Sequence, residues 1–213
     1  MDFREFEKRI VKVTKLELPG EEVHFKMAPI ERLEELKRAA EKQNTAKRAA
    51  VMALFYPSED GQTRLILILR KTYKGVHSAQ VGFPGGKVED EDENLAETAL
   101  RETEEEVGIS RKAISILKKL TEIYIPPSNF FVQPFLGITM ETPQFIPQED
   151  EVEALIEVDL ADFMEDANIT TQTLTTSYAK NIEVPAFKLN DHIVWGATAM
   201  MLNEVRELLK LLL

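Results

Sequence analysis

Cysteine is absent from the 213-residue sequence, and histidine occurs only at His24, His77 and His192. Without cysteine the chain has no disulfide, no thiol nucleophile and no Cys-ligated zinc site. The three histidines are too scattered in sequence to indicate a histidine-rich metal site.

Long apolar runs are also missing. The sequence has no stretch of about 18 apolar residues, so no transmembrane helix is expected. Residues 1–5, MDFRE, are charged and polar, unlike the start of a signal peptide. These features predict a cytoplasmic protein that does not insert into a membrane.

Basic clusters are scarce. The formal net charge is −11, and no Lys/Arg-rich stretch occurs. Non-specific nucleic-acid binding depends on cations that neutralise phosphates, so this polyanionic chain is not expected to bind nucleic acid. A small phosphorylated substrate is compatible with the composition, because a metal and a few local cations can meet its charge.

An amphipathic helix is expected in the stretch that ends before Gly108. Its apolar-to-neutral positions recur at spacings of three and four residues, which places them on one face. These positions are Ala96, Ala99, Leu100, Thr103 and Val107. Gly108 suits the position just after the helix, because glycine readily adopts the left-handed conformation that ends helices.

Three carboxylates share one arc of this predicted helix. At about 100° per residue, Glu102, Glu105 and Glu106 lie together and clear of the apolar face, whereas Glu104 points to solvent. Like charges at this spacing repel by about 0.2–0.5 kcal/mol per pair. Their convergence without interspersed lysine indicates a hard divalent cation such as Mg²⁺. Residues 84–86, Pro-Gly-Gly, precede the helix and allow the backbone to approach a ligand closely.

The same stretch carries a recognisable motif. The segment RETEEEVGI, which begins at Arg101, resembles the second half of the Nudix box, R-E-U-x-E-E-x-G-U, with Thr103 where U is usually apolar. The full box is G-x5-E-x7-R-E-U-x-E-E-x-G-U. Glu93 lies eight residues before Arg101, and Asp92 lies six residues after Gly86, so either acid can fill the first acidic position.

The resemblance implies the Nudix fold, an α/β architecture with a mixed β-sheet between helices. It also implies hydrolysis of a pyrophosphate that joins a nucleoside to another group, with Mg²⁺ or Mn²⁺ as cofactor. Glu102 and Glu106 are the implied metal ligands. Glu105 is a third ligand or the general base, and Gly86 supplies a further carbonyl ligand.

Nudix enzymes often place the general base outside the box. The base therefore stays open between Glu105 and Glu151, with Glu149 as a further alternative. Arg101 is expected to orient carboxylates rather than to touch substrate, because Glu97 lies four residues earlier and can pair with it.

Residues ahead of the box resemble the signature of coenzyme A pyrophosphatases. Arg70 lies thirteen residues before the Phe of Phe-Pro-Gly-Gly, residues 83–86, and Gln80 falls where many members carry Gln. The sequence departs from the signature at Ile68, Lys71, Gly75 and Ala79. Gly75 replaces a second arginine, whose charge the nearby lysines are close enough to supply.

Two later stretches support the same subfamily. Residues 148–152, QEDEV, resemble its acidic loop, and residues 194–199, VWGATA, resemble its C-terminal segment. The expected substrate contacts are Arg70, Gln80 and Gly85, although Arg70 also fits a surface cation at the end of a strand. Trp195 is expected in the core rather than against the ligand. On coenzyme A the implied products are 3′,5′-ADP and phosphopantetheine.

Two other functions are compatible with the sequence. A Nudix pyrophosphatase for ADP-ribose, NADH or another nucleotide would differ only in its pocket. A non-catalytic Nudix ligand-binding module commonly lacks box glutamates, whereas Glu102, Glu105 and Glu106 are all present here. The expected partner is a small-molecule nucleotide substrate, and a homodimer is left open.

The chain is expected to form one Nudix domain, residues 49–213, with an N-terminal helical extension, residues 1–48, packed on it. Apolar spacing predicts helices at residues 2–16, 30–43 and 197–213. Short apolar runs predict strands at residues 49–56, 65–69, 114–117, 123–125, 131–139, 154–158, 183–187 and 193–195. His24 is expected on the surface of an edge strand, and the polar residues 168–177 in a loop or edge hairpin.

Overall fold

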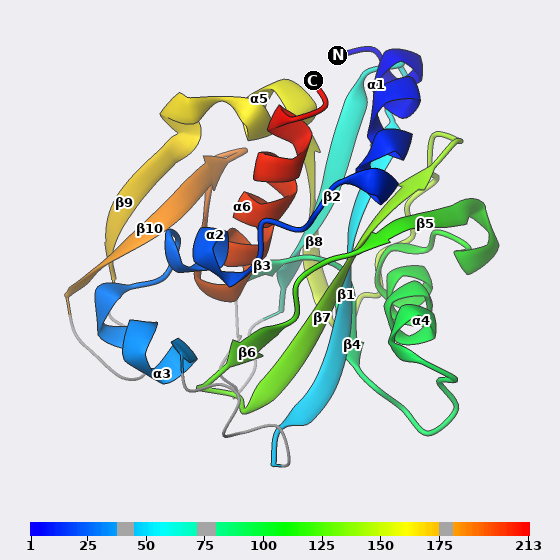
Figure 1. The fold of residues 1–213 in the computed structure, drawn as a ribbon. Helices are drawn as coiled ribbons and strands as arrows, with labels where there is room; N and C mark the ends of the chain where they lie inside the picture. The colour runs from blue at the N-terminus through cyan, green and yellow to red at the C-terminus, as the bar shows by residue number, and fades with distance from the viewer. Residues whose placement is uncertain (38–44, 72–79, 175–180) are drawn as a thin grey trace.

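The computed structural model describes residues 1–37, 45–71, 80–174 and 181–213. The strands form a large mixed sheet and a small sheet, with helices on both sides of the large one (Figure 1). This is the predicted α/β architecture. The α-helices are α1 (Phe3–Ile10), α2 (Glu21–Phe25), α3 (Leu33–Lys37), α4 (Leu95–Val107), α5 (Leu160–Met164) and α6 (Gly196–Lys210). The 3₁₀-helices are η1 (Val11–Lys15), η2 (Ile30–Arg32), η4 (Arg111–Ala113) and η5 (Asp166–Asn168).

The large sheet has the order β3-β2-β1-β7-β5, with β4 beside β1, β6 beside β7 and β8 beside β2. β1 and β7 are parallel, and the remaining pairs are antiparallel. Its strands are β1 (Lys47–Pro57), β2 (Thr63–Arg70), β3 (Val81–Gly82), β4 (Gly85–Lys87), β5 (Ile114–Lys119), β6 (Ile123–Ile125), β7 (Phe130–Thr139) and β8 (Val152–Asp159). The small sheet has the order β11-β10-β9 and contains β9 (Ile169–Leu174), β10 (Ile182–Leu189) and β11 (His192–Trp195).

One edge of β1 is shared by two strands. β4 pairs with residues 49–51 of β1, and β2 pairs with residues 55–57. The approach of β4 requires glycine, because a Cβ on Gly85 would lie 2.4 Å from the carbonyl oxygen of Ala50 and 2.6 Å from Cα of Val51. Gly85 also has a φ of +150°, which side chains disfavour. Gly85 therefore fixes the position of β4.

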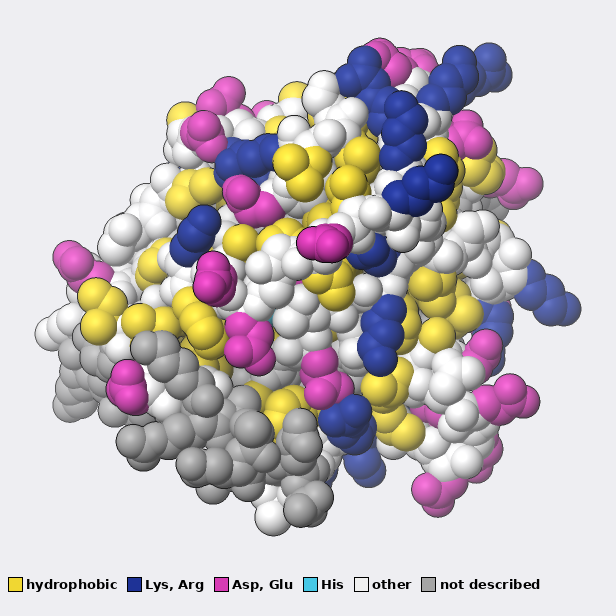
Figure 2. Space-filling model, in the orientation of Figure 1, with side chains coloured by type: hydrophobic (Ala, Val, Ile, Leu, Met, Phe, Trp, Pro, Cys, Tyr) yellow, Lys and Arg dark blue, Asp and Glu magenta, His cyan; other side chains and the backbone are white. Residues whose placement is uncertain are grey.

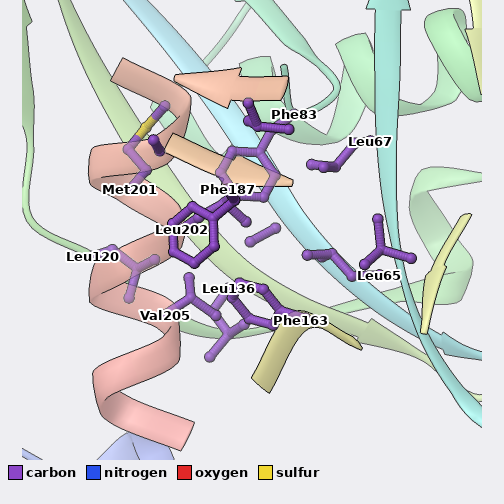
Figure 3. Packing of buried hydrophobic residues seen from close by; sticks show 14 of the residues in the cluster. Leu65, Leu67, Phe83, Leu120, Leu136, Phe163, Phe187, Met201, Leu202 and Val205 are labelled. Carbon is purple, nitrogen blue, oxygen red and sulfur yellow. The ribbon is translucent and has the colours of Figure 1, made fainter. Parts of the chain in front are cut away.

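Alternate residues of β1 face two hydrophobic clusters. Ala49, Ala53 and Phe55 belong to the cluster on the α6 side, and Met52 and Leu54 belong to the cluster beneath α4. Figure 3 shows α6 beside the buried side chains of the strands, and Met201, Leu202 and Val205 of α6 belong to the same cluster. The large sheet is therefore covered by apolar side chains on both faces, with α4 on one face and α6 on the other. This explains why β1 is apolar at nearly every position.

α4 is capped at both ends, and it ends at Gly108 as the sequence predicts. The Asn94 side chain accepts hydrogen bonds from the N–H groups of Ala96 (2.9 Å) and Glu97 (3.2 Å), which caps the first turn. Gly108 has a φ of +79° and donates its N–H to Glu104 O at 2.9 Å. A Cβ on Gly108 would lie 2.7 Å from Cβ of Ile146, so the end of α4 also packs tightly against the loop before β8.

The N-terminal segment packs on the α6 side of the large sheet. Phe3, Phe6, Ile10 and Val13 are buried in the same cluster as Phe55. Residues 38–43 of the predicted helix 30–43 lie outside the described residues, and the described part is η2 followed by α3. The division into a domain and an extension stays a prediction.

Several elements differ from the predictions. Residues 22–25 belong to α2 rather than to an edge strand, and His24 is buried, not on the surface, because its ring pairs with buried Glu204. β3 and β4 were not predicted, since two or three residues rich in glycine show no strand pattern. Of the two alternatives for residues 168–177, the described part forms an edge strand, β9, that pairs with β10.

No described helix is long and apolar enough to cross a membrane. Figure 2 shows acidic, basic and apolar side chains interspersed on one face, with Lys and Arg gathered over α1. Basic side chains are therefore concentrated at one end of this face.

Candidate active site

Arg101 holds several of the acidic side chains together. Its Nε and Nη2 donate to the two carboxylate oxygens of Asp92 at 2.9 and 3.0 Å, and Nη2 also donates to a backbone carbonyl at 3.1 Å. Its Nη1 donates to Glu102 Oε1 and Glu105 Oε2, both at 3.0 Å. These five contacts match the five N–H donors of a guanidinium. The predicted pair with Glu97 is therefore wrong, although Arg101 does orient carboxylates.

Asp92, rather than Glu93, is the acid that meets Arg101. The Asp92 side chain is only 4% exposed and accepts further hydrogen bonds from Glu89 N and Thr98 Oγ1, both at 2.9 Å. The hydrogen bonds from Arg101 hold the pKa of Asp92 well below its usual range. Glu93 is exposed, so it does not share this network.

Glu106 is buried beneath β4. Its side chain is 1% exposed, the N–H of Gly85 donates to Oε2 at 2.7 Å, and Arg70 Nη2 lies 3.3 Å from Oε1. Burial raises the pKa of Glu106 to about 7, against the opposing effects of Arg70 and of the Gly85 hydrogen bond. Glu106 was expected to lie clear of the buried face of the helix, but it is buried because β4 covers it.

Glu102 lies against the second glycine of β4. A Cβ on Gly86 would lie 2.4 Å from the Glu102 carboxyl group, so this close approach also needs glycine. Burial raises the pKa of Glu102 against the effect of Arg101, and the negative charges of Glu105 and Glu151 raise it further. Glu105 itself is about half exposed.

The loop that carries Glu151 is tied to α4 and β2. The N–H of Gln148 donates to the carbonyl of Glu106 at 3.2 Å, and the N–H of Lys71 donates to the carbonyl of Glu151 at 2.9 Å. The charge of Glu151 raises the pKa of both Glu106 and Glu102. Both alternatives for the general base, Glu105 and Glu151, are therefore exposed carboxylates within electrostatic reach of the cluster. Glu149 is exposed on the same loop.

The donor set fits a hard divalent cation. Such ions take oxygen ligands and keep several waters, and Glu106 Oε1 is a buried oxygen without a hydrogen-bond partner in the described residues. In the described part of the chain no three His, Cys, Asp or Glu side chains already form a metal-binding group. This agrees with Arg101 holding Glu102 and Glu105 while Gly85 holds Glu106.

A cavity of about 480 Å³ lies on the α6 side of the sheet. This volume falls within the range of small-molecule sites, about 300–1,000 Å³. Gly85, Gly86, Arg70 and Gln80 all line it. Since Gly85 and Gly86 also contact the carboxylates of α4, the cavity and the acidic cluster meet across β4.

The structure brings together most of the residues that the sequence singles out. Arg101 holds Glu102 and Glu105, and Arg70 lies 3.3 Å from Glu106 Oε1. Arg70 and Gln80 line the cavity. Gly75, His77 and Ala79 lie outside the described residues.

Sequence reasoning missed part of the cavity wall. Pro29, Arg32 and Leu36 of the N-terminal segment line the cavity, and no motif marks them. Tyr124 and Trp195 line it as well. Trp195 is partly exposed rather than a core residue. The signal that could have predicted its place in the cavity wall is the resemblance of residues 194–199 to the C-terminal segment of coenzyme A pyrophosphatases.

Comparison with known proteins gives one consistent family. The family model described as the NUDIX domain matches residues 46–176. The chain is 33% identical over 162 residues to "Nudix hydrolase 15, mitochondrial" of Arabidopsis thaliana, which covers 73% of this chain and 56% of that protein. It is 32% identical over 143 residues to "Uncharacterized Nudix hydrolase NudL" of Yersinia enterocolitica, covering 67% of this chain and 72% of that protein.

The chain spans only about half the length of the Arabidopsis relatives that it matches. Among solved structures, it is similar to the crystal structure of the Nudix hydrolase RenU from M. smegmatis. The TM-score is 0.54 at 15% identity, and the match covers 79% of this chain and 88% of that one. At this identity the likeness supports the fold alone.

Proposed function

This chain belongs to the NUDIX domain family, and on that premise we propose that it is a pyrophosphatase that depends on a divalent cation. The proposed reaction adds water across the P–O–P bond of a nucleoside diphosphate derivative. The observation that carries the proposal is the junction at β4, where buried carboxylates meet a ligand-sized cavity across two glycines.

Each residue of the junction has a physical role. Glu102 and Glu106, with Glu105 and a carbonyl of Gly86, would hold Mg²⁺ or Mn²⁺, and such a cation supplies charge that neutralises phosphate and acidifies water. Arg101 fixes the Glu102 and Glu105 carboxylates through its hydrogen bonds.

Proton removal from the attacking water needs a carboxylate within hydrogen-bond reach. Glu105 and Glu151 both have the exposure for that task, and Glu149 is the further alternative. Replacing each by glutamine separates them, because loss of the base lowers kcat at neutral pH and flattens the acidic limb of the pH–rate profile.

Coenzyme A or one of its derivatives is the proposed substrate. The support comes from Arg70, Gln80 and the Phe-Pro-Gly-Gly segment, which match the coenzyme A pyrophosphatase signature, and from their position along one cavity. Gly85 would let the diphosphate approach the backbone. The products would be 3′,5′-ADP and phosphopantetheine.

A substrate screen tests the proposal. Coenzyme A, ADP-ribose, NADH and dinucleoside polyphosphates would each be incubated with Mg²⁺, with Mn²⁺ or with a chelator, and the products separated by liquid chromatography. We expect coenzyme A to give the highest kcat/KM and the chelator to stop hydrolysis. Highest activity on ADP-ribose or NADH would refute coenzyme A as the substrate but would leave the proposed pyrophosphatase reaction intact.

Glu106→Gln is the matched inactive variant. It keeps the shape of the side chain but removes its charge, so we expect hydrolysis to fall to background while the protein stays folded. Near-normal turnover in this variant would refute the assignment of the acidic cluster. Binding of a nucleotide without hydrolysis by the unsubstituted protein would favour a non-catalytic module. A homodimer and a cytoplasmic location stay predictions, and size-exclusion chromatography with light scattering tests the first.

A further inference from the structure

The cavity carries positive charge although the chain is strongly acidic. Acidic residues outnumber basic ones by 37 to 26. Among the described residues, however, the cavity is lined by Arg32, Arg70 and Lys87 and by no acidic side chain. Of the box carboxylates, Glu106 lies 3.3 Å from Arg70, but none of them lines the cavity. Charge complementarity therefore favours a ligand with more than one anionic group.

Two of the three cations lie close to the carboxylate cluster. Arg70 donates to the carbonyl of Gly85 and lies 3.3 Å from Glu106 Oε1. Lys87 directly follows Gly86 in β4. Both cations therefore lie where the proposed function places the diphosphate that is hydrolysed.

The third cation, Arg32, comes from the N-terminal segment. It belongs to η2, beside α3, and lines the cavity together with Pro29 and Leu36. Leu36 is buried in the hydrophobic cluster on the α6 side of the sheet, whereas the box helix α4 packs on the opposite side. Arg32 is thus supplied by a wall that is separate from the box.

This wall is anchored by buried polar contacts. His24 Nε2 lies 3.0 Å from Glu204 Oε2, with both side chains at most 1% exposed. The side chain of Asn203 donates to the carbonyl of Val23 at 2.7 Å. Such contacts between α2 and α6 hold the segment in place before a ligand arrives, which reduces the entropy lost on binding.

We propose that Arg32 binds a phosphate group of the substrate that is not part of the hydrolysed diphosphate. This inference rests on the proposed function and restricts the range of substrates that the site would accept. It selects nucleoside diphosphate derivatives that carry a third phosphate, such as the 3′-phosphate of coenzyme A. A guanidinium suits this task, because its planar fork donates two parallel hydrogen bonds to one phosphate.

A matched pair of substrates tests the proposal. Coenzyme A and 3′-dephospho-coenzyme A differ only in the third phosphate. We expect Arg32→Gln to lower kcat/KM for coenzyme A by about tenfold to a hundredfold, mainly through KM, the range for a lost charged hydrogen bond. The same variant should leave kcat/KM for 3′-dephospho-coenzyme A nearly unchanged, and Arg32→Lys should recover part of the loss.

Lys26→Gln is the control. Lys26 is exposed on the same segment and does not line the cavity, so its loss removes the same charge without touching the ligand. We expect it to leave both substrates unaffected. Equal losses on both substrates in Arg32→Gln, or no loss on either, would overturn the role of Arg32.

A binding measurement separates this inference from the proposed function. Calorimetry with metal-free protein compares 3′,5′-ADP with AMP, which lacks the 3′-phosphate. The proposal expects about tenfold or greater preference for 3′,5′-ADP, lost in Arg32→Gln. Equal affinity for the two nucleotides would contradict it. If the protein hydrolyses no substrate, the proposed function fails while this comparison still decides the role of Arg32.

Discussion

Asp92 receives two hydrogen bonds from Arg101, one on each carboxylate oxygen. The loop before α4 is thereby joined to the middle of the helix, at the residue that also holds Glu102 and Glu105. Loss of the Asp92–Arg101 pair should therefore affect the stability of the fold as well as the positions of Glu102 and Glu105.

Asp92→Asn should weaken that link. We expect a loss of about 2 kcal/mol in the free energy of unfolding, because a neutral amide replaces a charged acceptor. Since Arg101 lowers the pKa of Asp92 in the folded state, the stabilisation exists above pH 3.8 and is lost as the pH falls below that value. Urea unfolding between pH 2 and pH 6 should therefore show a smaller acid-induced loss for the variant.

Glu93→Gln is the control for this prediction. Because Glu93 is exposed, this substitution should change the free energy of unfolding of the protein by less than about 0.5 kcal/mol. A larger effect at Glu93 than at Asp92 would mean that the wrong acid has been assigned to the first position of the box.

Glu106 should make the metal-free protein less stable as the pH rises. Its folded pKa is raised from 4.5 to about 7 by burial, so the stability associated with its protonated form is present below pH 4.5 and lost as the pH rises toward 7. At pH 8, metal-free Glu106→Gln should exceed the unsubstituted protein in stability by up to about 3 kcal/mol, since each pKa unit corresponds to about 1.4 kcal/mol.

Thermal unfolding with and without Mg²⁺ completes that test. The cation should raise the Tm of the unsubstituted protein at pH 8, because it binds only the folded state. It should leave Glu106→Gln nearly unchanged. An equal rise in both proteins would place the cation elsewhere.

Gly86→Ala should impair metal binding more than folding. The added Cβ would lie 2.4 Å from the Glu102 carboxyl group, which is the end of a flexible side chain and can move away. We expect a stability change below about 1 kcal/mol and a weaker Mn²⁺ affinity, measured by calorimetry, because Glu102 is displaced.

Gly85→Ala provides the contrast. Its Cβ would lie 2.4 Å from the backbone carbonyl of Ala50, which β1 holds in place. Loss of more than about 3 kcal/mol is expected, since backbone strain and overpacking combine. Comparable stability of the two alanine variants would show that β4 does not need to lie so close to β1.

His24→Ala should destabilise the junction between α2 and α6. It leaves the Glu204 carboxylate buried, with Thr121 as its remaining hydrogen-bond donor among the described residues. We expect a loss of about 2–3 kcal/mol in urea unfolding. His192→Ala, at a partly exposed position, should cost less than about 1 kcal/mol and serves as the comparison. Similar losses would argue that the buried pair with Glu204 adds no specific stability.

Elements with strong patterns agree with the structure. β1, β2 and β7 are apolar runs, and α4 ends at Gly108 as its glycine predicts. Short elements such as α2 and β4 could not be predicted, because their conformation depends on what they pack against. The assignment of His24 failed for that reason, since its partner Glu204 is 180 residues away.

The sequence by itself determined the family and the residues of the acidic cluster, because both depend on spacing along one helix. It also excluded thiolate metal ligands, because the chain has no cysteine. Only the tertiary structure decided that Asp92 faces Arg101, that Glu106 is buried and that Arg32 joins Arg70 in one cavity. Those facts depend on contacts between segments far apart in the chain, which local spacing does not contain.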